Sequence, residues 1–291
     1  MYQKVEFISK CYSMKNFTLT YLLFLIIGFS GCQEKNETVP DIPDEGIKSI
    51  TSLKIMTYNV HYCNPPSMPA SFIDVDAIVN VINAEKPDLI ALQEIDVNVN
   101  RSGNIHQAQL IGSKLHMRYF FAKAIDFQGG DYGVLILSKY PLSETTIHRL
   151  PTLAGSGGEP RVFATAKVTL PDGLTLRFGN THLDAQQDHT NRNLQMDKIL
   201  EIVNNDDLPF IIAGDFNAVP GTEVIKKLDS AFTRTCEICP PTIPVLNPTR
   251  AIDFIAYTDH INLFKTSSHK VINETYASDH RPVVSVLDLN Q

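Results

Sequence analysis

The protein has 291 residues, of which 43% are hydrophobic and 20% are charged. This is ordinary globular composition, and the chain is long enough for one large core or two small ones. The formal net charge is -7, and it becomes -9 without residues 1–31, which carry a net charge of +2. This negative net charge disfavours binding of duplex nucleic acid, because proteins contact its phosphates mainly with cationic side chains.

The segment "MKNFTLTYLLFLIIGFSGC" (14–32) is typical of a targeting segment. A basic residue opens it, and an apolar run from Leu19 to Phe29 leads to small residues before Cys32. This run is shorter than the roughly 20 residues that span a bilayer as a helix. "FSGC" resembles a bacterial lipobox, in which Cys32 would be lipidated and become the mature N-terminus. A plain secretory signal with a coincidental cysteine is the alternative, and Met14 is a second candidate start.

These features predict the organisation of the chain. We expect residues 1–31 to be a lipoprotein signal peptide, residues 32–50 a polar tether and residues 51–291 one domain, because no linker interrupts the last segment. The protein would then be exported and lipid-anchored to a membrane of the bacterial cell envelope. "CEIC" (236–239) has no second cysteine pair to complete a zinc site, so a local disulfide and two free thiols both remain open.

Short apolar runs that end in polar clusters dominate the chain after Leu53 and predict strands. They lie at 53–60, 88–94, 132–138, 161–170, 174–182, 209–215, 252–257 and 281–289. Apolar residues at helical spacing predict helices from Val75 to Ile82 and from Met196 to Val203, and residues 105–116 form a third candidate. Many strands with few helices predict an α/β fold with two packed sheets flanked by helices.

Polar side chains gather at the ends of these predicted strands. They are Asn59, His61, Glu94, Asn180, His182, Asp184, Asp215, Asn217, Asp253, Asp279 and His280. A single Asp at a strand end is usually a turn or cap residue, and a single His beside aliphatic residues is usually structural. Together, carboxylates, amides and histidines without a cationic surplus are the groups expected of a hard-metal phosphate site.

Seven motifs carry a resemblance to a known family: "TYNVH", "LQEID", "YGVLILSKYPL", "NTHLD", "AGDFNAVPG", "IDFIAY" and "SDHRPV". Their order over residues 53–288 resembles that of the endonuclease/exonuclease/phosphatase superfamily. The resemblance implies a DNase-like, four-layer α/β sandwich of two packed mixed β-sheets flanked by helices, with the active site at one edge. It also implies that residues 51–291 are a catalytic domain with Mg²⁺, or alternatively Mn²⁺, as cofactor.

The resemblance further implies a role for each motif residue. Glu94 resembles the principal metal ligand, with Asn59 beside it and Asp279 contributing directly or through water. Asp215 resembles the residue that orients and deprotonates the attacking water, while Asn217 holds a phosphate oxygen or Asp215 itself. His280, oriented by Asp253, resembles the phosphate-binding or acid-base histidine, and His182 resembles the histidine that donates to the phosphoryl group. Water would then attack in line without a covalent intermediate.

One departure concerns His61, which stands where several nuclease members carry an aspartate; a second metal site is therefore not implied. We expect His61, Asn180, Arg101 and Tyr132 on the substrate side of the site, with His106 as a further candidate. The predicted function is metal-dependent hydrolysis of a small or lipid-linked phosphate ester by a monomer. An exported nuclease and a non-catalytic surface binding module are the alternatives, and loops 62–72, 125–131 and 152–160 would shape the substrate pocket.

Overall fold

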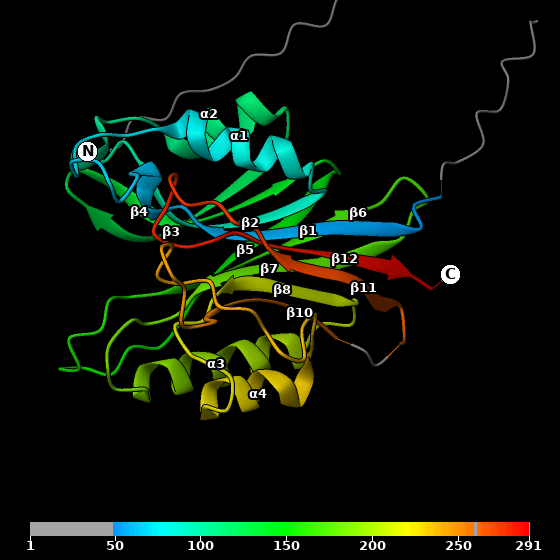
Figure 1. Ribbon diagram of the computed structural model, residues 1–291. Coiled ribbons are helices and arrows are strands. Elements are labelled where there is room, and N and C mark those ends of the chain that lie inside the picture. Colours follow the sequence, from blue (N-terminus) through cyan, green and yellow to red (C-terminus); the bar gives the residue numbers. More distant parts are fainter. Residues whose placement is uncertain (1–48, 259–260, 291) are drawn as a thin grey trace, which may run out of the picture. The chain divides into compact units, whose positions relative to one another are not determined.

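The computed structural model describes residues 49–258 and 261–290, which form two six-stranded sheets and four α-helices (Figure 1). The first sheet has the order β11 (Phe264–Val271), β12 (Val283–Leu289), β1 (Ser52–Asn59), β2 (Leu89–Val97), β4 (Gly130–Ser138) and β3 (Arg118–Phe127). The second has the order β5 (Leu142–Arg149), β6 (Val162–Thr169), β7 (Thr175–His182), β8 (Phe210–Asp215), β10 (Asp253–Tyr257) and β9 (Thr233–Arg234).

The helices cover the outer faces of the sheets. Helices α1 (Val75–Glu85) and α2 (Gln107–Leu115) lie over the first sheet, and α3 (Thr190–Asn204) and α4 (Glu223–Ala231) lie over the second (Figure 1). One apolar core fills the space between the sheets, and two further cores lie beneath the helix pairs. The predicted four-layer α/β sandwich is therefore confirmed.

Strand pairing brings the polar strand ends together at one edge. β1 pairs in parallel with β2, and β7 pairs in parallel with β8, while their other pairings are antiparallel. In the second sheet, Asp215 lies opposite His182 on one side and opposite Asp253 on the other. The carboxyl ends of β1, β7 and β8 and the amino end of the antiparallel β10 therefore present polar atoms at a common rim.

Left-handed backbone occurs at this rim. Glu94 has φ 60° at an irregularity in the pairing of β2 with β4, and His61, Tyr62 and Cys63 have φ values of 49°, 42° and 59° in succession. Residues other than glycine rarely adopt such φ values, and they concentrate where a structure must aim a side chain. The bulge turns Glu94 out of the regular alternation of β2.

Several predictions outside the sheets are also answered. Cys236 and Cys239 form a disulfide, and Cys63 is free and buried. The predicted signal peptide, Cys32 and most of the tether lie outside the described residues. Within the described ranges, no helix combines the length and apolarity needed to cross a membrane.

Candidate active site

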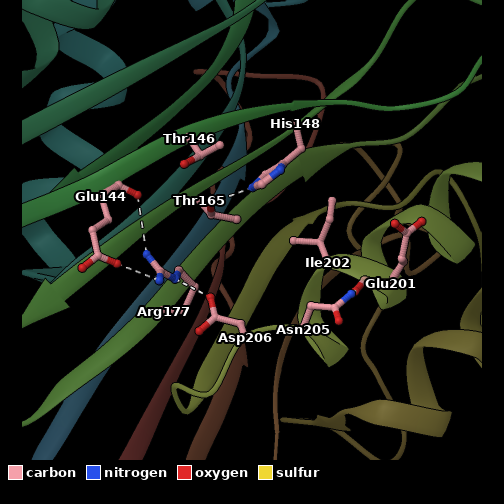
Figure 2. Close-up of a pocket in the computed structure, with 9 residues that line it drawn as sticks. All are labelled: Glu144, Thr146, His148, Thr165, Arg177, Glu201, Ile202, Asn205 and Asp206. Carbon is pink, nitrogen blue, oxygen red and sulfur yellow. Dashed lines mark hydrogen bonds and ion pairs between the residues drawn. The ribbon is translucent and has the colours of Figure 1, made fainter.

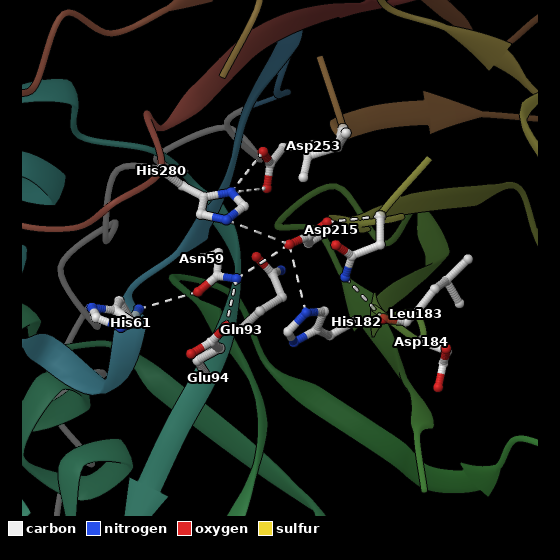
Figure 3. A network of polar contacts seen from close by, with 12 residues as sticks. Asn59, His61, Gln93, Glu94, His182, Leu183, Asp184, Asp215, Asp253 and His280 are labelled. Atoms are coloured by element: carbon white, nitrogen blue, oxygen red, sulfur yellow. Dashed lines mark hydrogen bonds and ion pairs between the residues drawn. The ribbon is translucent and has the colours of Figure 1, made fainter. Parts of the chain in front are cut away.

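Asp215, the last residue of β8, lies at the centre of the polar rim and is only 1% exposed (Figure 3). Its Oδ1 accepts a hydrogen bond from the backbone N–H of Asn217 at 2.8 Å, and its Oδ2 accepts one from Nδ2 of Asn59 at 3.2 Å. The Nε2 atoms of His182 and His280 lie 3.6 and 3.8 Å from the same Oδ2. Burial raises the pKa of Asp215, and the charge of the nearby Asp253 adds a smaller effect, so that the pKa is about 7.

His280 is held by Asp253, as the sequence predicts. The Nδ1 atom of His280 lies 3.0 Å from Asp253 Oδ2, and this carboxylate also accepts a short hydrogen bond from the Thr242 hydroxyl. Burial lowers the pKa of His280, but the charges of Asp253 and Asp215 outweigh burial and raise it to about 10. The imidazole is therefore a cation at neutral pH, with Nε2–H directed toward Asp215 (Figure 3).

His182 is in the opposite state because it is buried and because it contacts Arg161, which is 7% exposed. Arg161 Nη1 lies 3.3 Å from His182 Nδ1 and 3.1 Å from Glu159 Oε1. A guanidinium only donates hydrogen bonds, so Nδ1 of His182 must accept, and the proton of the neutral ring resides on Nε2. Burial and the Arg161 charge lower the pKa of His182 well below its usual value, so His182 faces Asp215 as a neutral donor.

Glu94 and Asn59 form the metal side of the rim. Asn59 Nδ2 donates to Glu94 Oε1 at 3.0 Å as well as to Asp215, while its Oδ1 accepts from the backbone N–H of His61 at 3.1 Å. Asn59 thus acts as a donor that holds the two carboxylates together. Its Oδ1 keeps a second lone pair, so the prediction that Asn59 is also a metal ligand stays a prediction.

The donor set fits a hard divalent cation. Glu94 has no ion pair among the residues that the structure describes, and it shares one amide donor with a second carboxylate. Asp279 is partly exposed and contacts Ser278, so its carboxylate has remaining lone pairs. Asp215, Asp253 and His280 also offer ligand atoms within 4.8 Å of one another. In that group His280 Nδ1 is committed to Asp253, so the carboxylates are its more available donors, and oxygen donors are those that a hard cation prefers.

Asn180 contradicts its predicted place on the substrate side. Its side chain is fully buried, and its Nδ2 donates to the carbonyls of Leu92 and Leu135, both at 2.9 Å. Its Oδ1 accepts from Gln93 Nε2 at 2.8 Å. Every side-chain atom of Asn180 that forms hydrogen bonds is therefore used in joining the two sheets, which excludes contact with substrate in this structure.

The other predicted substrate-side residues differ in burial and in their partners within the protein. Arg101 forms two hydrogen bonds with Asp96, at 2.8 and 2.9 Å, and stacks on the Tyr62 ring at 3.9 Å. Tyr132 is buried, and burial raises its pKa well above the usual value. His106 caps α2 through Nδ1, which accepts from the backbone N–H of Gln109.

Two further predicted residues lie at the rim. His61 is partly exposed beside Asn59, with Nδ1 2.9 Å from the Asn64 carbonyl oxygen. Asn217 contacts Asp215 through its backbone, while its side chain donates to the carbonyl of Leu183 at 3.0 Å. Of the two alternatives for Asn217, the structure therefore shows the contact with Asp215.

The comparisons with known proteins agree with this geometry. The fold and the polar rim define a DNase-like α/β sandwich, and the model of the endonuclease/exonuclease/phosphatase family matches residues 56–280. The chain belongs to that family, whose members are hydrolases of phosphoester bonds.

Solved structures show the same fold at low identity. A family protein from Bacteroides thetaiotaomicron is 19% identical with a TM-score of 0.70, and the match covers 83% of this chain and 99% of that one. The mannosyl-6-phosphatase of the same organism is 19% identical with a TM-score of 0.67, covering 81% and 99%. The human Nocturnin catalytic domain with bound sulfate is 20% identical with a TM-score of 0.64, covering 82% and 95%.

Proposed function

We propose that the protein is a divalent-metal-dependent hydrolase of small or lipid-linked phosphate esters, acting as a monomer by in-line attack of water. The observation that carries this proposal is the arrangement around Oδ2 of Asp215. Three donors, from Asn59, His182 and His280, approach one buried carboxylate oxygen. A buried carboxylate with a raised pKa is suited to accept a proton near neutral pH.

Each residue then has a distinct task. Asp215 orients the attacking water and takes its proton. The cationic His280, held by Asp253, binds a phosphoryl oxygen, and the neutral His182 donates a hydrogen bond to another as negative charge develops. Glu94 and Asp279 would hold Mg²⁺ or Mn²⁺, which when bound supplies charge neutralisation for the phosphoryl group.

The state of the basic residues favours a compact ester over a polynucleotide. Lys123 is paired with Asp126 and Asp131, and Lys139 is paired with Asp88. Arg101 is paired with Asp96, and Arg161 is buried. These cations are thus engaged within the protein, whereas a nuclease must neutralise several phosphates along its substrate. The phosphatase named among the structural neighbours also supports this choice.

A binding module is disfavoured because burying the Asp215 carboxylate is costly and serves no purpose in binding alone.

Metal dependence provides the direct test. Purified residues 47–291 should lose activity toward phosphate esters in EDTA and regain it with Mg²⁺ or Mn²⁺. Glu94→Gln should shift the metal concentration that restores half of the activity to higher values. Full activity after exhaustive chelation would contradict the mechanism, and efficient plasmid degradation without turnover of any compact ester would favour the nuclease.

We also propose that Cys32 is lipidated and anchors the exported protein to the cell envelope. The Cys236–Cys239 disulfide supports an oxidising compartment. The described chain enters the domain at the start of β1, opposite the end that bears Asn59 (Figure 1).

The anchor can be tested separately from catalysis. Cys32→Ser should move the protein out of the membrane fraction, because the lipid would be its membrane attachment. A chain starting at Ile47 should be soluble and fully active. Continued sedimentation of that shorter chain with membranes would point to a different attachment surface.

A further inference from the structure

An apolar pocket of about 410 Å³ adjoins the catalytic rim. This volume is in the range of pockets that bind small organic molecules. Its lining comes from three separate loops and comprises Pro66, Ser67, Ile243, Pro244, Val245, Leu246, Arg250, Thr275 and Asp279. Asp279 immediately precedes His280, so the pocket and the candidate phosphoryl site share a boundary.

Each loop of the pocket is attached to a residue of the rim. Thr242, which precedes the lining residue Ile243, donates to the carboxylate of Asp253. Ser278, which precedes Asp279, donates to the carbonyl of Asn59 at 2.7 Å. Pro66 and Ser67 follow the left-handed turn that begins at His61. The pocket is thus fixed relative to the groups that would hold the phosphoryl centre.

The loop that supplies most of the apolar wall is itself well supported. The backbone of Ile243 exchanges hydrogen bonds with that of Arg250, which closes the loop. Arg281 then donates to the carbonyls of Thr242 and Val245, at 2.8 and 2.9 Å. These contacts keep Leu246 at the pocket although its side chain is 64% exposed. A supported loop that exposes a large apolar side chain is suited to contact an apolar ligand.

We infer that this pocket binds the organic group of the substrate, and that this group is an alkyl or acyl chain rather than a sugar or a nucleoside. The inference rests on the proposed function, because it assumes that the phosphoryl group lies at Asp215. Five of the nine lining residues are proline or aliphatic, and four of these follow one another from Ile243 to Leu246, so one wall of the pocket is continuously apolar and suits a hydrocarbon chain better than a sugar. Burial of each methylene would instead strengthen binding.

The experiment measures chain-length dependence on the purified full chain. Methyl, butyl and hexyl phosphate, their methyl diesters and a hexose 6-phosphate are compared for kcat/KM in Mg²⁺. Binding of the same compounds to Asp215→Asn is measured by calorimetry. We expect kcat/KM and affinity to rise about fourfold for each added methylene, until the pocket is full.

Two matched substitutions locate the effect. Leu246→Ser removes an apolar side chain from the pocket and should weaken the dependence on chain length, with a loss of about tenfold for the hexyl ester. Ile238→Ser, which is 92% exposed in the disulfide loop and outside the pocket lining, should retain the dependence of the unmodified protein.

The outcomes separate this inference from the proposed function. Turnover without any dependence on chain length, or a preference for the hexose phosphate, would overturn the inference and leave phosphoester hydrolysis intact. Chain-length-dependent binding without turnover of any ester would support the pocket and contradict the proposed function. Equal effects of Leu246→Ser and Ile238→Ser would also overturn the inference.

Discussion

Two regions of this protein gather charged and polar side chains, but they differ in whether ion pairs compensate those charges. One is the catalytic rim around Asp215 (Figure 3). The other is a pocket of about 380 Å³ on the α3 side of the second sheet, which we call the outer-face pocket (Figure 2). Glu144, Thr146, His148, Thr165, Arg177, Glu201, Ile202, Asn205 and Asp206 line it.

In the outer-face pocket, the central charges compensate one another. Arg177 forms ion pairs with Glu144 at 2.9 Å and with Asp206 at 2.6 Å, and Glu144 also pairs with Lys167 at 3.0 Å. Hydrogen bonds from Lys167 and Arg177 lower the pKa of Glu144, whereas burial raises that of Asp215. The lowered pKa of Glu144 is typical of a carboxylate that links structural elements through ion pairs. The raised pKa of Asp215 is typical of a carboxylate that can take up a proton near neutral pH.

The largest expected effect follows from Asp215→Asn. Loss of the proposed general base should reduce turnover by roughly 10²–10⁴-fold. The same change should stabilise the metal-free protein, because the raised pKa means that ionising the buried carboxylate opposes folding. Turnover of a phosphate ester and thermal unfolding in EDTA are the measurements.

The stability effect has a defined dependence on pH. Between the ordinary pKa of Asp and about 7, the unfolded chain loses a proton that the folded protein keeps, so stability of the unmodified protein falls as pH rises. The advantage of Asp215→Asn should therefore grow from pH 4 to pH 7 and then remain constant. A constant difference across this range would show that the pKa of Asp215 is not raised.

A smaller effect is expected at Arg161, which we regard as a positioning residue for His182. Burial disfavours protonation of His182, and the Arg161 charge adds to this effect. Arg161→Gln removes that charge, and a glutamine can donate or accept at Nδ1. We expect kcat/KM to fall about tenfold, in keeping with one charge-assisted hydrogen bond. Nitrogen NMR of the His182 ring should show Nε2–H in the unmodified protein and a mixture of forms in the variant. Unchanged ring signals would contradict this role.

The fold was predictable where strands are buried on both faces. All eight predicted strands are present, and each lies inside a sheet. The strands that sequence patterns missed, β3, β5, β9 and β11, are the four sheet edges. β5 and β11, for example, are largely exposed along their length. An edge strand lacks a continuous apolar run, so its sequence is hard to distinguish from a loop.

The residues of the site could largely be predicted from the sequence, whereas the contacts between them were harder to predict. Asp215 ends β8, Asp253 begins the antiparallel β10 and His280 precedes β12, so three strands of strong pattern bring them to one edge. Arg161 was missed as a partner of His182, 21 residues away, because the antiparallel pairing of β6 with β7 creates that contact. Asn180 was misassigned because strand alternation cannot tell the rim from the space between two sheets, where Leu92 and Leu135 provide its acceptors.

The smallest effect on activity is expected in the outer-face pocket. Arg177→Gln would leave Asp206 without its cation and should lower the free energy of unfolding by about 1–3 kcal/mol, because both side chains are largely buried. Turnover and metal dependence should stay within about twofold of the unmodified protein, since none of these charges contacts the catalytic rim. Denaturant unfolding and steady-state kinetics on the same preparation measure both quantities. A tenfold loss of turnover with unchanged stability would show that the outer-face pocket is coupled to catalysis, and the distinction between compensated and reactive charges would then fail.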